Sequence, residues 1–77
     1  MLTREQKNKV VIELTKIYYE KEMPNAILSE QVIKDGYKSL ETKTEEELIE
    51  LVCILSSKLF DYYQPKELGE IILKKIL

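Results

Sequence analysis

Residues 44–63 read TEEELIELVCILSSKLFDYY, and this stretch decides the fold. Thr44 precedes Glu47 by three positions, which is the spacing of a capping box at a helix start. The three glutamates that follow Thr44 would lie at the positive end of the helix dipole, where acidic side chains are stabilising. Apolar residues then recur at three- and four-residue steps: Leu48, Leu51, Val52, Leu55, Leu59 and Tyr62. The pattern predicts a helix that runs to about Tyr63, before Pro65.

The apolar residues of this predicted helix extend round more than one side. Ile49, Cys53, Phe60 and Tyr63 widen the main stripe, and Ile54 falls nearly opposite to it. A helix that is apolar around most of its circumference is usually buried by more than one neighbour. We therefore expect residues 44–63 to form the long central helix of the fold.

A first helix is predicted from Thr3 to about Lys21. Thr3 and Gln6 have capping-box spacing, and Pro24 disfavours helical geometry in the residue before it. Between these signals lies one apolar stripe: Val10, Val11, Leu14, Ile17 and Tyr18.

A last helix is predicted from Pro65 to the end of the sequence, because proline is favoured at the first helical position. Its apolar residues are Leu68, Ile71, Ile72, Leu73, Ile76 and Leu77. Gly69 weakens the interior of such a helix, and close packing against a neighbour would account for it.

The stretch 25–43 is less regular. Ser29 can cap a short helix that reaches Asp35, and Gly36 suits the left-handed residue that closes many helices. Tyr37 and Leu40 would then turn a short connection back onto the core. The whole pattern predicts an all-α fold, a small bundle of three to four helices with a long central helix, and residues 1–77 form a single helical domain.

The composition argues against several functions. The chain has 77 residues, of which 44% are apolar and 34% charged, and it contains no His, no Trp and one cysteine. A structural zinc site needs four Cys or His ligands, and a nucleophilic triad usually needs a His base. No phosphate-binding loop or metalloprotease motif is present. We therefore expect no enzymatic activity, no metal and no cofactor, and we expect Cys53 to be a buried small apolar side chain.

The expected environment is the cytoplasm. No apolar run approaches the roughly 18 residues that a membrane span needs, and the opening residues 1–4 lack the apolar core of a signal peptide. A lone cysteine also suits a reducing compartment better than a disulfide-stapled secreted domain.

Nucleic-acid binding is the alternative function. The predicted helix from Ser29, the glycine at position 36 and the following helix loosely resemble a helix-turn-helix arrangement. However, the net charge is −2, the pI is near 5.2 and Arg4 is the only arginine. The second helix would also present Glu45, Glu46 and Glu47 to phosphate, so nucleic acid is a poor fit as a partner.

The leading hypothesis is a small non-catalytic protein-interaction or regulatory module that binds a protein partner. Adjacent tyrosines point about 100° apart on a helix, so one member of each Tyr pair must lie at the edge of the core. The candidate partner interface comprises Tyr19, Ile54, Tyr62, Tyr63, Leu73 and Leu77. A chain this short is marginal as a monomer, so a homodimer through the last helix and the outer side of residues 44–63 is also expected. Small size and a Lys/Ile/Glu-rich composition also suit a subunit or inhibitor encoded by a phage or mobile element.

Overall fold

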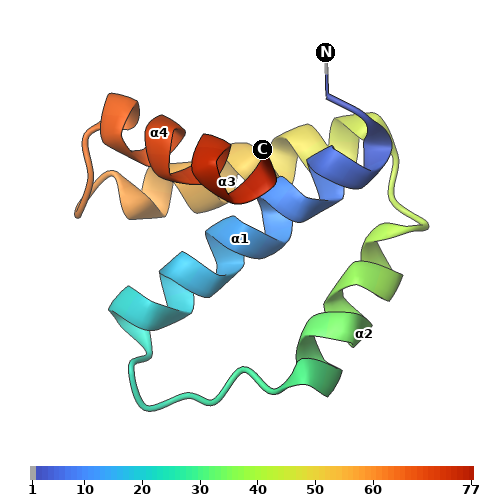
Figure 1. Cartoon of the computed structure of the whole chain (residues 1–77), viewed down its shortest axis with the longest axis horizontal. Helices are drawn as coiled ribbons and strands as arrows, with labels where there is room; N and C mark the ends of the chain where they lie inside the picture. The colour runs from blue at the N-terminus through green and yellow to red at the C-terminus, as the bar shows by residue number, and fades with distance from the viewer. Residues whose placement is uncertain (1) are drawn as a thin grey trace.

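The computed structural model describes residues 2–77, so residue 1 of the predicted domain lies outside the description. Within these residues the chain forms four α-helices and no strand (Figure 1). The helices are α1 (Arg4–Glu22), α2 (Glu30–Leu40), α3 (Glu45–Leu59) and α4 (Pro65–Ile76). The predicted all-α bundle is confirmed.

The helix starts lie where the local signals predict them. Thr3 Oγ1 accepts a hydrogen bond from the Gln6 amide at 3.1 Å, and Gln6 Oε1 accepts one from the Thr3 amide at 2.8 Å. The same reciprocal pair joins Thr44 and Glu47 at the start of α3, at 3.1 and 2.9 Å. Each capping box satisfies two amide groups that have no partner within the helix. Pro65 is the first residue of α4, as expected.

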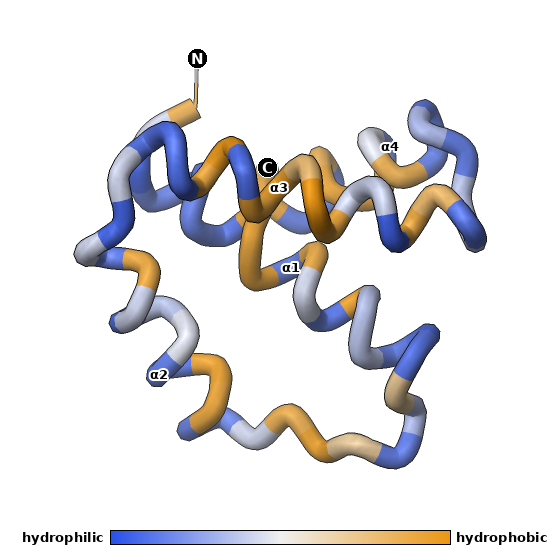
Figure 2. The backbone as a smooth tube through the Cα atoms, turned by 180° about the vertical axis from the view of Figure 1, so that it is seen from behind, coloured by the Kyte–Doolittle hydropathy of each residue, from blue (hydrophilic) through white to orange (hydrophobic). Residues whose placement is uncertain are grey.

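The central helix is α1, and the expectation that residues 44–63 occupy the centre is wrong. α1 packs against each of the other three helices, whereas contacts among α2, α3 and α4 are sparse. Its 19 residues span about 28 Å, so α1 reaches across most of the 30 Å length of the molecule. Figure 2 shows hydrophobic residues of α1, α3 and α4 gathered where these three helices meet.

Two groups of buried residues make up the core. The larger one joins α1, α3 and α4, and the smaller one joins α1, α2 and α3. The larger group comprises Leu14, Ile17, Leu59, Leu68, Ile72 and Ile76, and the smaller one Val11, Ile12, Leu40 and Leu48. Val52 and Leu55 are half-buried and pack against both groups, so the two parts of the core are continuous along α3.

α2 is longer than predicted. It runs through Gly36 to Leu40, and neither glycine of the described chain has a positive φ, so Gly36 is not a left-handed helix end. The physical reason is tertiary: Gly36 lies against Ile12 of α1, and Leu40 is buried one turn later. The Arg4 guanidinium donates to the carbonyl oxygens of Leu40 and Lys43, and thus holds the end of α2 and the turn after it against α1.

α3 is shorter than predicted, because it ends at Leu59 and not at Tyr63. The Leu59 carbonyl accepts hydrogen bonds from the amides of Tyr62 and Tyr63, which closes a tight turn. Gln64 is extended, as expected for a residue before proline, and it leads directly into α4. This turn brings α4 back onto α1.

Candidate protein-interaction surface

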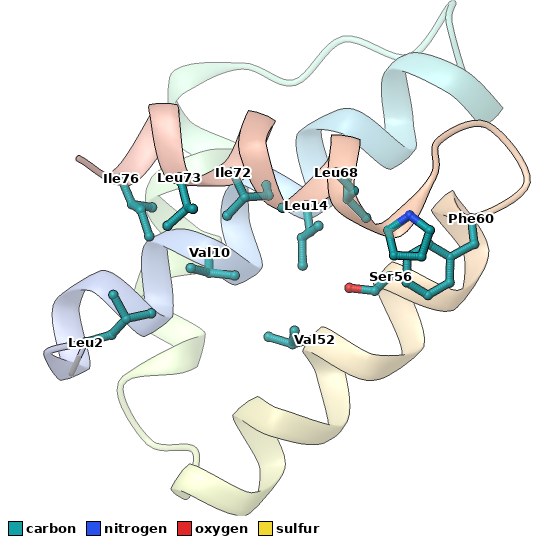
Figure 3. Close-up of a pocket in the computed structure, with 12 residues that line it drawn as sticks. Leu2, Val10, Leu14, Val52, Ser56, Phe60, Leu68, Ile72, Leu73 and Ile76 are labelled. Carbon is teal, nitrogen blue, oxygen red and sulfur yellow. The ribbon is translucent and has the colours of Figure 1, made fainter.

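An apolar groove runs between α3 and α4. Both helices pack on α1 but contact each other sparsely, so α1 forms the floor and the other two form the walls (Figure 3). The volume of the groove is about 320 Å³. Its floor is Val10 and Leu14, one wall is Val52, Ser56 and Phe60, and the other is Pro65, Leu68, Gly69, Ile72, Leu73 and Ile76, with Leu2 also in the lining. We call this feature the α3–α4 groove.

The groove continues into a second hollow of about 220 Å³. The two share Leu2, Val10 and Val52, and the second hollow adds Leu48, Ile49 and Cys53. Lys7 and Glu45 also line this adjoining hollow, whereas the lining of the groove itself contains no charged residue. The surface between α1, α3 and α4 is therefore a continuous apolar depression with charges confined to one part.

Large apolar side chains stand exposed along this depression. Ile49 is 62% exposed, Leu73 is 50% exposed and Phe60 is 46% exposed. Single exposed apolar residues are common on protein surfaces, but contiguous apolar patches typically mark interaction sites. Here the exposed side chains and the depression belong to the same surface, so together they form one candidate interaction site.

One end of the depression is fixed by charged side chains. Lys7 Nζ donates a hydrogen bond to Glu45 Oε2 at 2.7 Å and joins α1 to α3, and Arg4 lies 3.6 Å from the other oxygen. The hydrogen bond from Lys7 holds the pKa of the Glu45 carboxyl below its ordinary value, and the positive charges of Lys7 and Arg4 act in the same direction. These side chains are only partly buried, and the ion pairs join the start of α1 to the start of α3.

The six predicted interface residues do not form one surface. Leu73 lines the α3–α4 groove, and Leu77 is 88% exposed at the end of the chain. Ile54 is 47% exposed and lines a small hollow with Lys43, Glu47, Glu50 and Leu51, none of which lines the groove.

The three predicted tyrosines occupy positions outside the groove. Tyr62 donates its hydroxyl to Glu22, and this hydrogen bond raises the pKa of Tyr62. Tyr63 packs against the larger core group, with Lys21 Nζ 5.4 Å from its ring centroid. Tyr19 lines the cleft between α1 and α2 and meets Tyr18 edge to face at 6.2 Å.

Two expectations about single residues are wrong. Cys53 is exposed and not buried, because α4 packs on α1 and leaves that side of α3 uncovered. Gly69 has no close neighbour, since a Cβ at this position would meet nothing within 4 Å. Close packing within the chain therefore does not account for Gly69.

Sequence reasoning missed several residues of the depression, including Leu2, Ser56 and Gly69. A signal was nevertheless present on α3. Ile49, Cys53, Ser56 and Phe60 follow one another at steps of four, three and four residues, which is a second helical stripe beside the buried one.

Two features that would indicate other functions are absent from residues 2–77. No helix in this range has the length and apolar character required to cross a membrane. The described chain also contains no group of three or more potential metal ligands. Comparison with known proteins finds no matching family model, no similar curated protein and no similar solved structure.

Proposed function

We propose that this chain is a small non-catalytic protein-interaction or regulatory module, and that the α3–α4 groove binds its protein partner. The observation that carries the proposal is an uncharged groove of about 320 Å³ bordered by half-exposed Phe60 and Leu73. Apolar surface of this kind gains free energy when a second apolar surface covers it, at about 25 cal/mol per Å².

The chemistry of the lining supports binding over catalysis. Ser56 is the one residue of the groove lining with a polar side chain, and a hydroxyl without an adjacent base is a weak nucleophile. A catalytic pocket combines apolar walls with several convergent polar groups, which this lining lacks. Aromatic and large aliphatic side chains such as Phe60 and Leu73 are the types that anchor protein interfaces.

The proposal is tested by affinity capture of a tagged chain from a lysate of the source cells, with two matched variants. Leu73→Glu places a charge in the groove wall, and Ile54→Glu places one on an equally exposed residue outside the groove. We expect the wild type and Ile54→Glu to retain the same partner, and Leu73→Glu to lose it, because an unpaired charge would be buried on binding. Retention of every partner by Leu73→Glu contradicts the proposal.

The helix-turn-helix alternative requires a separate measurement. α2 and α3 are joined by a short turn, but Glu45, Glu46 and Glu47 at the start of α3 are all exposed. Titration with random duplex DNA at rising salt distinguishes the two functions, because phosphate-driven binding weakens steeply with salt. We expect no tight binding at any salt concentration. Tight binding with a steep salt slope would replace the present proposal with the alternative.

A further inference from the structure

We infer that the occupant of the α3–α4 groove is a second copy of this chain, in a twofold dimer in which α4 of each copy lies across the groove of the other. The inference rests on the proposed function, since it names the partner of the same groove. It differs from the expectation drawn from the sequence, because Ile54 and the outer side of α3 take no part.

The exposed area of the molecule supports a missing partner of this size. The chain exposes 5667 Å², whereas a folded monomer of 9.1 kDa is expected to expose about 4,900 Å². The surplus is about 800 Å², which is the area that each partner covers in an interface of standard size. The side of α1 that faces α2 and the preceding connection contributes part of this surplus. The two hollows there, of about 130 and 240 Å³, differ from the α3–α4 groove because their linings include charged side chains, Lys16 in both and Glu20 in the larger one.

The lining favours a copy of the same chain over a different protein. Interfaces between permanently associated copies resemble a protein core and are more apolar than interfaces between proteins that also exist apart. The groove lining carries no charged side chain that would select a foreign partner. A chain that buries only about 57% of its unfolded surface, with neither a disulfide nor a metal cluster in its described part, is also of the kind that oligomerisation commonly stabilises.

Gly69 marks where the second helix would approach. It lies inside α4, where glycine is less favourable than alanine, and a Cβ at this position would meet nothing within 4 Å in the described chain. A glycine permits the backbone of another helix to come close, and Ser56 on the opposite wall is also small. When two copies of α4 cross on a twofold axis, the same residue lies at the crossing in both, so one glycine serves both helices.

Leu73 supplies the inserting side chain. It follows Gly69 by one helical turn, lines the groove and is 50% exposed. A projection therefore stands beside a depression on the same surface, which is the self-complementary arrangement that a twofold interface requires. Each copy would place Leu73 in the groove of the other.

The test measures mass by light scattering coupled to size exclusion, from micromolar to submillimolar protein. We expect the wild type to have twice the monomer mass of 9.1 kDa. Gly69→Lys adds a long charged side chain where the single chain has open space, so the fold is retained while the crossing is blocked. Ile54→Lys is the matched control outside the groove. We expect Gly69→Lys to be monomeric with unchanged helical circular dichroism, and Ile54→Lys to remain dimeric.

A cross-linking measurement covers the case in which Gly69→Lys fails to fold. In a Cys53→Ser background, Gly69→Cys should give a disulfide-linked dimer rapidly under mild oxidation, because the two positions face each other across the axis. Ile54→Cys in the same background should not. Failure of Gly69→Cys to cross-link faster than Ile54→Cys overturns the inference.

The outcomes separate the inference from the proposed function. A wild type that is monomeric at every concentration, yet loses a different protein partner on Leu73→Glu substitution, contradicts the dimer and supports the interaction module. A dimer that Ile54→Lys dissociates and Gly69→Lys does not would move the interface to the outer side of α3 and overturn the inference. A monomer with no groove-dependent partner contradicts both proposals.

Discussion

Gly36 of α2 lies so close to Ile12 of α1 that a Cβ on the glycine would stand 3.1 Å from Ile12 Cδ1. That separation is shorter than an ordinary van der Waals contact. The glycine therefore lets α2 approach α1, which is the helix that holds α2 to the rest of the fold. The contact explains why a residue of low helix propensity lies in the middle of a helix.

Substitution of the two glycines by alanine should have different effects. Gly69→Ala should raise the free energy of unfolding of the monomer by about 0.5–1 kcal/mol, because alanine favours a helix interior and the site is open. Gly36→Ala should give a smaller gain or a loss, since Ile12 must move. In an Ile12→Val background, which lacks Cδ1, Gly36→Ala should recover the gain. Urea denaturation of the four variants at a concentration where the chain is monomeric measures this, and additive effects of Gly36→Ala and Ile12→Val would contradict it.

Arg4 should be more important for stability than its partial exposure suggests. Its guanidinium donates to the carbonyl oxygen of Leu40 at 2.8 Å and to that of Lys43, and thus ties α1 to the end of α2. Arg4→Lys keeps the charge but loses the planar arrangement of donors, so we expect a loss of about 1–3 kcal/mol. Amide hydrogen exchange should accelerate in residues 36–44 before the rest of the chain. Lys34→Ala, an exposed position on α2, is the control and should leave the exchange pattern unchanged.

Two leucines on α3 differ in burial, so truncation of each to alanine should lower the free energy of unfolding by different amounts. Leu59 is fully buried in the larger core group, and Leu59→Ala should cost about 2–5 kcal/mol. Leu55 belongs to the predicted apolar stripe but is only half-buried, so Leu55→Ala should cost less. Thermal or urea unfolding of both variants gives the comparison. An equal or larger loss for Leu55→Ala would mean that the packing of α3 differs from the one described.

The start of α3 should make stability sensitive to acid. The Thr44 amide donates to Glu47 Oε1, and this hydrogen bond holds the pKa of Glu47 below its ordinary value near 4.5. The Lys7 hydrogen bond lowers the pKa of Glu45 in the same way. Because the folded pKa values lie below the unfolded ones, this contribution is complete above about pH 5 and is lost as the pH falls through the folded values.

The acid sensitivity is checked by urea unfolding from neutral pH to about pH 3. Glu47→Gln keeps a capping-box acceptor that does not titrate, so stability should fall less steeply with pH than in the wild type. Glu46→Gln lies on the same turn but outside the capping box, and it should reproduce the wild-type slope more closely. Identical slopes for wild type and Glu47→Gln would show that the Thr44–Glu47 bond does not contribute.

Local signals in the sequence predicted the parts of the fold that depend on neighbouring residues. Thr3, Ser29, Thr44 and Pro65 mark the four helix starts correctly, because caps and prolines act within a single turn. These local signals do not predict which helices pack against one another. Whether α4 lies beside α3 or on α1 depends on the turn after Leu59 and on contacts between distant residues.

The residues of the candidate surface were likewise predictable from the sequence only in part. Leu73 lies in the groove as part of the predicted interface, and the wide apolar circumference of α3 was visible in the sequence. The exposure of Cys53 and the empty space beside Gly69 were not, because both result from the separation of α3 and α4. A helix pattern shows which side chains are apolar, and only the tertiary arrangement shows which of them remain uncovered.

The exposure of Cys53 has a practical consequence for every experiment on this surface. It is the one thiol of the chain, and it lines the hollow that adjoins the groove. An environment-sensitive dye can therefore be attached to the natural sequence at a single defined position. Its emission would report directly, and in real time, whether the neighbouring apolar surface is exposed to water or covered by a partner.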